Sequence, residues 1–167
     1  TMAMRDGLTG LGNRRFLDEQ LPMLVAATRE SGDELVCVLM DLDNFKAVND
    51  TLGHAAGDDL LVLMGQLVAA CVRDTDIAAR LGGDEFVVLM PGADAARGGE
   101  LADNLRKLFR QQTRASSPEG PHADVSAGVS AMSAEGCATG EALLELADAH
   151  LYEAKRGGKG RTYVSKR

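Results

Sequence analysis

The sequence contains no tryptophan, and its three cysteines are too few and too widely spaced for a disulfide framework or a zinc site. This cysteine usage suits a reducing compartment, so we expect a cytoplasmic domain. No apolar run is long enough to cross a bilayer and no secretory signal is visible, so this part of the chain predicts no membrane insertion of its own. The net charge of −7 argues against general binding to nucleic acid.

The 167 residues that are present are enough for one domain with a hydrophobic core. Apolar periodicity predicts helices after an N-cap at Asn13, at 44–51, from about 56 to 71, from about 94 to 112 and around 143–154. It predicts strands at 35–42, 77–81, 85–90, 125–129 and 161–164. This order resembles the ferredoxin-like split βαβ arrangement. We therefore expect an α+β fold with a mostly antiparallel sheet of about five strands, flanked by helices.

Two adjacent glycines, Gly82 and Gly83, separate two apolar runs, and Asp84 and Glu85 follow them at once. Gly-Gly between strands predicts a tight hairpin turn, because both residues tolerate positive φ. Paired acids where a backbone can approach a ligand closely favour a divalent metal and a phosphorylated substrate. The alternative is an ordinary hairpin with a solvated acidic tip.

A second acidic cluster begins at the end of the apolar run 35–42. A carboxylate at Asp41 is unfavourable there unless it is paired or bound to metal. In a ferredoxin-like sheet this strand lies beside the hairpin, so we expect Asp41 and Asp84 to face one another across a shared cation, with the backbone carbonyl of Leu42 as a further ligand. Asp43 is a candidate cap for the helix that follows.

The turn after Leu42 predicts an anion site. Free backbone N–H groups of Asn44 and Phe45 would point toward a phosphate at the start of the short helix. Lys46 would neutralise charge that develops on a transferring phosphoryl group. A solvated surface lysine is the alternative for Lys46.

Asn49 and Asp58 suit the edge of a guanine base. A carboxylate accepts from the N1–H and N2–H₂ donors, and an amide donates to the O6 and N3 acceptors. A turn residue and a helix-terminal charge are the respective alternatives. His54 lies between them and would either touch the ligand or fill the turn.

The chain resembles the GGDEF family of diguanylate cyclases over nearly its whole length. The resemblance rests on Arg-Asp-Gly-Leu-Thr-Gly-Leu-Gly-Asn-Arg-Arg at 5–15, the block 41–58, Arg-Leu-Gly-Gly-Asp-Glu-Phe at 80–86, Ser-Ala-Gly-Val at 126–129 and Ala-Asp-Ala-His-Leu-Tyr-Glu-Ala-Lys at 147–155. It implies a fold like the palm of nucleotidyl cyclases and polymerases. It also implies condensation of two GTP into cyclic di-GMP, with Mg²⁺ as the metal (Mn²⁺ is the alternative) and a homodimer as the catalytic unit.

The resemblance implies for the residues above the roles already described, and it adds others. Asp84, with Glu85, would help to deprotonate the attacking 3′-hydroxyl. Lys155 would contact the terminal phosphates. Lys159 stands where a further phosphate-binding residue is expected, or Arg161 takes that role after a one-residue shift.

Arg73 and Asp76 form an Arg-x-x-Asp pattern, with Arg73 nine positions before Gly82. The family's product-inhibition site has this form and this distance. Arginine supplies forked donors for phosphate or a guanine edge, and aspartate accepts from guanine. An exposed ion pair of little energetic value is the alternative. The family often adds an arginine from the next long helix, where this chain has Asn104 and, close by, arginines at 106, 110 and 114.

We expect residues 1–167 to form a single GGDEF catalytic domain cut from a longer chain, whose N-terminal regulatory region, if membrane-bound, would anchor the full-length protein. Three alternatives stay open: a non-catalytic module that senses GTP or cyclic di-GMP, a cyclase that also accepts ATP, and a partner-binding domain. The presence of Asp41, Lys46, Asp84 and Glu85 speaks against the first. Asp58 disfavours adenine, and no residue supports the third.

Overall fold

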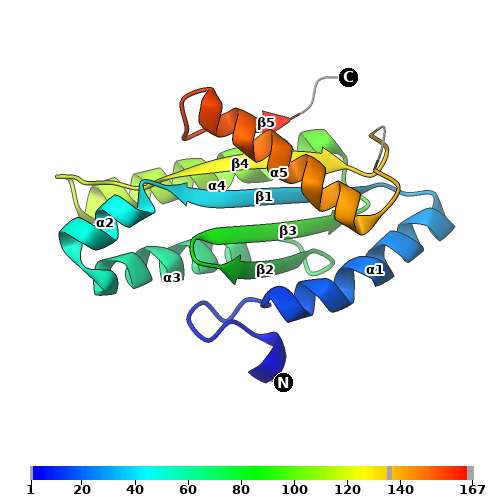
Figure 1. The fold of residues 1–167 in the computed structure, drawn as a ribbon, viewed down its shortest axis with the longest axis horizontal. Coiled ribbons are helices and arrows are strands. Elements are labelled where there is room, and N and C mark those ends of the chain that lie inside the picture. Colours follow the sequence, from blue (N-terminus) through cyan, green and yellow to red (C-terminus); the bar gives the residue numbers. More distant parts are fainter. Residues whose placement is uncertain (1, 135–136, 165–167) are drawn as a thin grey trace.

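The computed structural model describes residues 2–134 and 137–164 of the chain. In chain order, the elements of Figure 1 are the 3₁₀ helix η1 (Met2–Met4), α1 (Arg14–Ser31), β1 (Leu35–Asp43), α2 (Phe45–Leu52), α3 (His54–Cys71), β2 (Ile77–Gly82), β3 (Glu85–Pro91), α4 (Ala95–Ser116), β4 (Asp124–Ala131), α5 (Gly140–Arg156) and β5 (Thr162–Val164). None of these helices has the length and hydrophobicity that crossing a bilayer requires, within the residues described.

The strands form one sheet in the order β2-β3-β1-β4-β5. β1 is central and pairs antiparallel with both β3 and β4, whereas β5 pairs parallel with β4. Helices α1 and α5 lie on one side of the sheet in Figure 1, and α3 and α4 lie on the other. The predicted α+β fold, with five mostly antiparallel strands flanked by helices, is confirmed.

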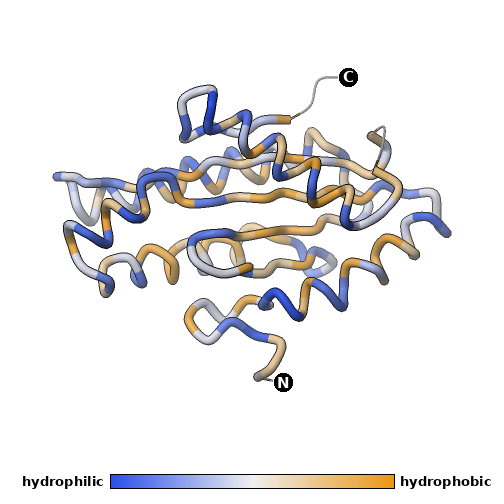
Figure 2. Tube along the Cα trace, viewed as in Figure 1, coloured by the Kyte–Doolittle hydropathy of each residue, from blue (hydrophilic) through white to orange (hydrophobic). Residues whose placement is uncertain are grey.

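β1 has two apolar faces because its side chains alternate across the sheet. Val36, Val38, Met40 and Leu42 pack with α2, α3 and α4, and Leu35, Cys37 and Leu39 pack with α1 and α5. All nine residues of the strand are buried, and the apolar centre of the sheet is evident in Figure 2. Asp41 and Asp43 continue the second series, so both carboxylates belong to the face that α5 covers.

Two predicted helix boundaries need correction. α3 begins at His54, two residues before the predicted start, because Gly53 has φ of 94° and both ends α2 and precedes α3. α4 continues four residues beyond the predicted 112 and ends at Ser116. Its last turn is still part of the core, since Thr113 is buried and its hydroxyl donates to the carbonyl of Phe109 at 2.8 Å.

Candidate active site

The acidic end of β1 lies beside the hairpin turn. Asp41 is paired in register with Glu85 across β1 and β3. One residue further, the backbone N–H of Leu42 donates to the carbonyl of Asp84 at 3.3 Å. The structure therefore brings Asp41, Asp84 and Glu85 together at the same end of two neighbouring strands, although forty-odd residues separate them in the chain.

Hydrogen bonds from the Arg80 side chain hold the hairpin turn in place. Gly82 and Gly83 have φ of 132° and 53°, which explains the glycine pair. The Arg80 guanidinium donates to the Gly83 carbonyl at 2.9 and 2.8 Å, and to the Asp6 carboxylate at 3.0 Å. Thr9 donates to the other Asp6 oxygen through its N–H and its hydroxyl. The segment before α1 thus fixes the turn that carries Asp84.

This clamp was not predicted from the sequence. Asp6 and Arg80 are 74 positions apart, and each has an ordinary role as a lone residue. Burial raises the pKa of Asp6, but the hydrogen bonds from Thr9 and the charge of Arg80 outweigh burial and leave that pKa below its usual value. The signal in the sequence was only that both residues fall within the segments that carry the family resemblance.

Asp41 is a buried carboxylate with one oxygen satisfied and one not. Its Oδ2 accepts from the ammonium of Lys155 on α5. Its Oδ1 is buried and has no hydrogen-bond partner among the residues that the structure describes. Burial raises the pKa of Asp41, Lys155 opposes the rise, and the charges of Asp84 and Asp43 add to it, so the pKa lies above its ordinary value.

The pKa of Lys155 also rises. Burial lowers it, but the hydrogen bond and charge of Asp41, with the charges of Asp43 and Asp84, outweigh burial. Two partners of an ion pair usually shift in opposite directions. Here both pKa values rise because Asp41 stands among other carboxylates, while Lys155 faces several carboxylates at once.

Glu85 completes this crowding of negative charge. It is half-buried, and burial followed by the charges of Asp148, Asp41 and Asp84 raises its pKa. A hard divalent cation takes oxygen ligands and removes such repulsion, and the unpartnered Oδ1 of Asp41 is a ligand of that kind. Within residues 2–134 and 137–164, no group of three or more His, Cys, Asp and Glu side chains is arranged for a metal ion. The predicted set of Asp41, Asp84 and the Leu42 carbonyl needs only two such side chains.

Asp43 does not cap α2, so that interpretation is wrong. The N-cap is Asn44, in a left-handed conformation with φ of 67°, and no side chain of the described chain caps this helix end. β1 remains extended through Asp43, so its side chain follows the strand alternation toward α5. There it accepts from the Ser126 hydroxyl and from the backbone N–H of Gly160 at 2.9 Å.

Lys46 and Asn49 both belong to α2, but their side chains have different neighbours. The Lys46 side chain is 90% exposed and pairs with Asp50 at 2.8 Å, so it makes no contact with the acidic cluster. Asn49 packs against the first turn of α3, where a Cβ on Gly57 would lie 1.7 Å from its Oδ1. Glycine at 57 therefore lets Asn49 approach the backbone just before Asp58. Asp58 and His54 are exposed.

The turn after α5 carries the remaining predicted phosphate contacts. Lys159 is exposed and has φ of 63°, a conformation that is uncommon for a non-glycine residue. Arg161 folds back on the turn: its Nε donates to the Lys159 carbonyl at 3.3 Å, and its guanidinium would lie 2.6 Å from a Cβ on Gly158. This leaves the Lys159 side chain as the more available of the two cations.

Arg73 and Asp76 form a second charged site at the end of α3. Asp76 has a side chain only 1% exposed. It accepts from the Arg73 N–H at 2.8 Å and from the Arg73 guanidinium at 2.7 Å. The aspartate of this pair is therefore buried, while the Arg73 side chain is 42% exposed. A cavity of about 290 Å³ lies beside it, and its lining includes Arg97 and Asn104.

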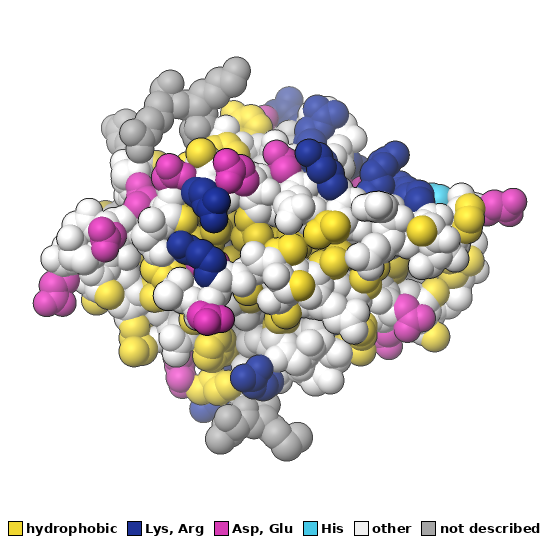
Figure 3. Space-filling view, turned by 180° about the vertical axis from the view of Figure 1, so that it is seen from behind, with side chains coloured by type: hydrophobic (Ala, Val, Ile, Leu, Met, Phe, Trp, Pro, Cys, Tyr) yellow, Lys and Arg dark blue, Asp and Glu magenta, His cyan; other side chains and the backbone are white. Residues whose placement is uncertain are grey.

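The arginines considered for this second site point elsewhere. Arg106 binds Gly160 and Thr162, and Arg110 and Arg114 bind Asp124. Figure 3 shows Lys and Arg side chains gathered in the upper right part of the face that α4 covers. Arg97, which lies two turns before Asn104 on α4, lines the cavity instead. The i, i+7 spacing was the signal that could have found it.

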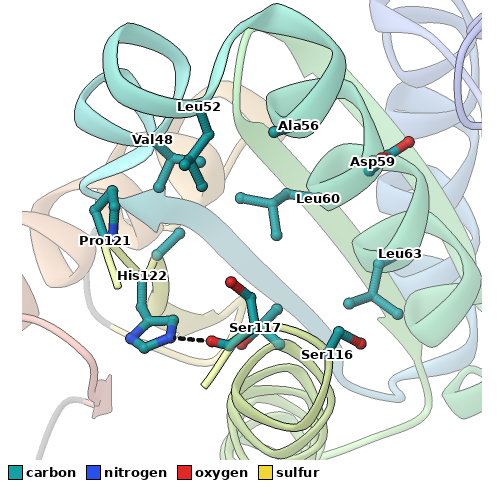
Figure 4. Close-up of a pocket in the computed structure, with 12 residues that line it drawn as sticks. Val48, Leu52, Ala56, Asp59, Leu60, Leu63, Ser116, Ser117, Pro121 and His122 are labelled. Carbon is teal, nitrogen blue, oxygen red and sulfur yellow. Dashed lines mark hydrogen bonds between the residues drawn. The ribbon is translucent and has the colours of Figure 1, made fainter. Parts of the chain in front are cut away.

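Another cavity, of about 430 Å³, lies between α2, α3 and the end of α4 (Figure 4). Val48, Leu52, Leu60 and Leu63 make it largely apolar, and His122 hydrogen-bonds the Ser117 carbonyl at its edge, at 2.6 Å. Its described lining includes none of the predicted site residues. This cavity is therefore separate from the acidic end of β1 and from the cavity beside Asp76.

A family model described as "Diguanylate cyclase, GGDEF domain" matches residues 3–161. Among curated proteins, the chain is 39% identical to the diguanylate cyclase DgcP of Pseudomonas aeruginosa, over 98% of this chain and 24% of that protein. It is 41% identical to the response regulator PleD of Caulobacter vibrioides, over 95% of this chain and 35% of that protein. It thus spans about a quarter to a third of the length of these two relatives.

The solved structures agree with these sequence matches. The GGDEF domain of DgcB from Caulobacter crescentus, in complex with c-di-GMP, superposes with a TM-score of 0.86 at 31% identity, over 97% of this chain and 95% of that one. The GGDEF domain of TpbB from Pseudomonas aeruginosa gives a TM-score of 0.85 at 36% identity, over 97% of this chain and 94% of that one.

Proposed function

Because this chain belongs to the GGDEF domain family of diguanylate cyclases, we propose that it condenses two GTP molecules into cyclic di-GMP and two pyrophosphates. One observation carries the proposal beyond family membership. The buried Oδ1 of Asp41 lacks a hydrogen-bond partner within the described chain, beside Asp84 and Glu85, at a place where a cation would neutralise all three.

In this proposal Asp41, Asp84 and the carbonyl of Leu42 hold Mg²⁺, or Mn²⁺ in its place. When bound, the ion supplies positive charge next to the triphosphate. Asp84, assisted by Glu85, accepts the proton of the attacking 3′-hydroxyl. The raised pKa of Glu85 makes it a better proton acceptor than an ordinary carboxylate near neutral pH.

The bond changes are those of an in-line displacement. The 3′-oxygen of one GTP forms a bond to the α-phosphorus of the other, and the bond from that phosphorus to the bridging oxygen of pyrophosphate breaks. The displaced pyrophosphate carries away the electron pair. Repetition with the roles exchanged closes the ring, so a homodimer with two facing domains is the catalytic unit that we propose.

Substrate binding in this proposal uses two groups of residues. The N–H groups of Asn44 and Phe45, with Lys46, Lys155 and Lys159, bind the phosphates. Asn49 and Asp58 read the guanine edge, with His54 beside it. The packing of Asn49 against Gly57 supports this pairing, because it places an amide next to the backbone that carries Asp58.

We also propose that the cavity beside Arg73 and Asp76 binds the product and inhibits the enzyme. The cavity adjoins a fully paired aspartate and a half-exposed guanidinium, and Arg97 adds a second cation to its lining. DgcB, a structural neighbour, was solved with c-di-GMP bound. The alternative function, a sensor that binds GTP or cyclic di-GMP without turnover, uses the same residues.

The test uses purified protein freed of bound nucleotide, incubated with GTP and Mg²⁺ at high protein concentration. We expect chromatography with mass detection to show one cyclic di-GMP for every two pyrophosphates, and no product from ATP. An Asp84→Ala variant is the control. Nucleotide binding with no product above that control would overturn the cyclase proposal in favour of the sensor. Comparable turnover of ATP would overturn the assignment of Asp58.

A further inference from the structure

Asp43 is a buried carboxylate that the proposed reaction does not use. It is 6% exposed and lies two residues beyond Asp41 on the same face of β1. Its Oδ2 accepts from the Ser126 hydroxyl and from the Gly160 N–H at 2.9 Å, and that same N–H also reaches the Ser126 hydroxyl oxygen at 3.1 Å. Burying a carboxylate is unfavourable unless it is well hydrogen-bonded, so this arrangement points to a positional role.

Gly160 is held on its other side as well. Its carbonyl accepts from the guanidinium of Arg106 at 2.7 Å, and the same guanidinium donates to the Thr162 hydroxyl at 3.1 Å. Asp103 pairs with Arg106 at 2.7 Å and orients it. Gly160 is thus held by hydrogen bonds on two sides. Its N–H donates to Asp43 on β1, and its carbonyl accepts from Arg106 on α4.

The turn that contains Gly160 has an unfavourable backbone conformation, which these hydrogen bonds hold in place. Gly158, Lys159 and Gly160 have φ of 124°, 63° and 56° in succession. Left-handed backbone is unfavourable for a residue with a Cβ, and Lys159 adopts it in the middle of the turn. The hydrogen bonds to Gly160 therefore maintain a backbone conformation that the turn's own sequence does not favour.

The turn determines where two cations lie. Lys155 is in the last turn of α5, immediately before it, and its ammonium reaches Asp41. Lys159 is in the turn itself. We propose that Asp43 is a positioning residue, which holds the Gly160 backbone so that Lys155 and Lys159 face the terminal phosphates of the nucleotide. This inference rests on the proposed function, because it presumes a GTP site at the end of β1.

The test compares ligands that differ only at the phosphate end and the 3′ position. 3′-Deoxy-GTP has no 3′-hydroxyl and binds without turnover, and GMP lacks the terminal phosphates. For Asp43→Ala we expect the affinity for 3′-deoxy-GTP to fall about tenfold, the equivalent of one charge-assisted hydrogen bond, while the affinity for GMP stays within about twofold. The backbone amide signal of Gly160 in an NMR spectrum should shift, and its hydrogen exchange should accelerate.

Three further variants separate positioning from a general loss of structure. Asp43→Asn keeps an acceptor oxygen, so it should recover most of the affinity for 3′-deoxy-GTP. Arg106→Gln releases the Gly160 carbonyl and should reproduce the selective loss. Ser126→Ala leaves the bond from Gly160 to Asp43 in place, so it should lower the melting temperature without changing the ratio of the two affinities.

The outcomes are distinct. An equal loss of affinity for both ligands in Asp43→Ala, or no loss for either, overturns the positioning role while GTP binding by the unmodified protein still stands. A selective loss with an unmoved Gly160 amide also overturns it, since the effect would not pass through the turn. If the unmodified protein binds neither ligand, the proposed function fails and this inference fails with it.

Discussion

Among the aspartates that pair with a cation, Asp76 and Asp41 do so in opposite ways. Asp76 accepts from the backbone N–H of Arg73 and from Nε and Nη2 of its guanidinium, and its side chain is 1% exposed. Asp41 receives only Lys155, keeps a buried oxygen without a partner in the described chain, and stands beside Asp84 and Glu85. One site is complete in itself, and the other has more negative charge than the protein neutralises.

The two aspartates differ in whether the protein itself balances their charge. A satisfied pair such as Arg73 and Asp76 stabilises the end of α3 whether or not a ligand is present. An excess of buried charge destabilises the fold, and it becomes favourable only when something else brings a cation. The acidic end of β1 therefore carries charge that its neighbours in the described chain leave unbalanced, whereas the charge of Asp76 is already paired with Arg73.

The largest effect should come from removing charge at the incomplete site. We expect Asp84→Asn to lower cyclic di-GMP formation by at least about 10³-fold, since the variant loses a metal ligand and the proton acceptor together. Its melting temperature should not fall, because one of the repelling carboxylates is gone. Product measured by chromatography and unfolding followed by circular dichroism check both parts.

The matched control for this change is Glu145→Gln, which removes a nearby exposed carboxylate that has no assigned role. It should retain most of the activity. Turnover by Asp84→Asn within tenfold of the unmodified protein would contradict the proposed ligand set.

A smaller effect is expected from Lys46. Because its side chain is 90% exposed and pairs, within the described part of the chain, only with Asp50, Lys46→Ala should leave the stability unchanged. We expect kcat to fall about 10²-fold with little change in KM, since the lysine would act on charge that develops in the transition state. Steady-state kinetics measure how the loss of activity divides between kcat and KM.

Asp50→Asn is the companion variant, because it frees Lys46 without removing it. Its kcat should equal or exceed that of the unmodified protein. If Lys46→Ala retains full activity, the lysine is a solvated surface residue, which is the alternative that its exposure already raises.

The sequence alone was sufficient to predict the helices and strands, and to predict that Asp41 and Asp84 lie on neighbouring strands. Residues 35–42 form a continuous apolar run, which is typical of a central strand, and the glycine pair marks the turn with its positive φ values. Given a ferredoxin-like order, the neighbouring positions of Asp41 and Asp84 follow from the pairing of the strands. Long periodic helices and a two-glycine turn are local signals, and local signals are readable without coordinates.

The supporting contacts were not readable in this way. The bond from Arg80 to Asp6, the bond from Gly160 to Asp43 and the place of Arg97 each depend on residues from separate segments of the chain. Asp43 shows the reason: an aspartate just before a helix has the pattern of a cap, and only the extended backbone of β1 turns its side chain to the other face. Side-chain direction at a strand end depends on one residue of register.

At the complete site, we expect Asp76→Ala to lower the free energy of unfolding by about 2 kcal/mol, because the variant leaves the Arg73 N–H and guanidinium without their acceptor. Arg73 is partly exposed, which keeps the loss below that of a fully buried pair. Urea denaturation measures it. Catalysis at low product concentration should persist, and inhibition by added cyclic di-GMP should weaken by about tenfold or more.

Arg97→Gln is the control that separates stability from product binding. Its side chain is exposed and, among the described residues, pairs only with Glu100 at 3.5 Å, so unfolding should be unaffected while inhibition weakens. Unchanged inhibition in both variants would show that the cavity beside Asp76 does not bind the product.

The smallest effect is expected from Glu85, and it has a defined sign. Burial and the neighbouring acids raise its pKa above the ordinary 4.5, so the native state holds this proton more tightly than the unfolded state does. Stability must then fall as pH rises from about 4.5 through the raised pKa, and Glu85→Gln should remove that fall. Because the group is half-exposed, we expect the variant to gain less than about 1 kcal/mol above that window and almost nothing below it. Urea titrations of both proteins across this pH range give the difference, and adding Mg²⁺ should shrink it by neutralising the same charge. If the free energies of unfolding of the two proteins change in parallel with pH, the neighbouring acids do not raise the pKa of Glu85. The contrast with Asp76 would then rest on Asp41 alone.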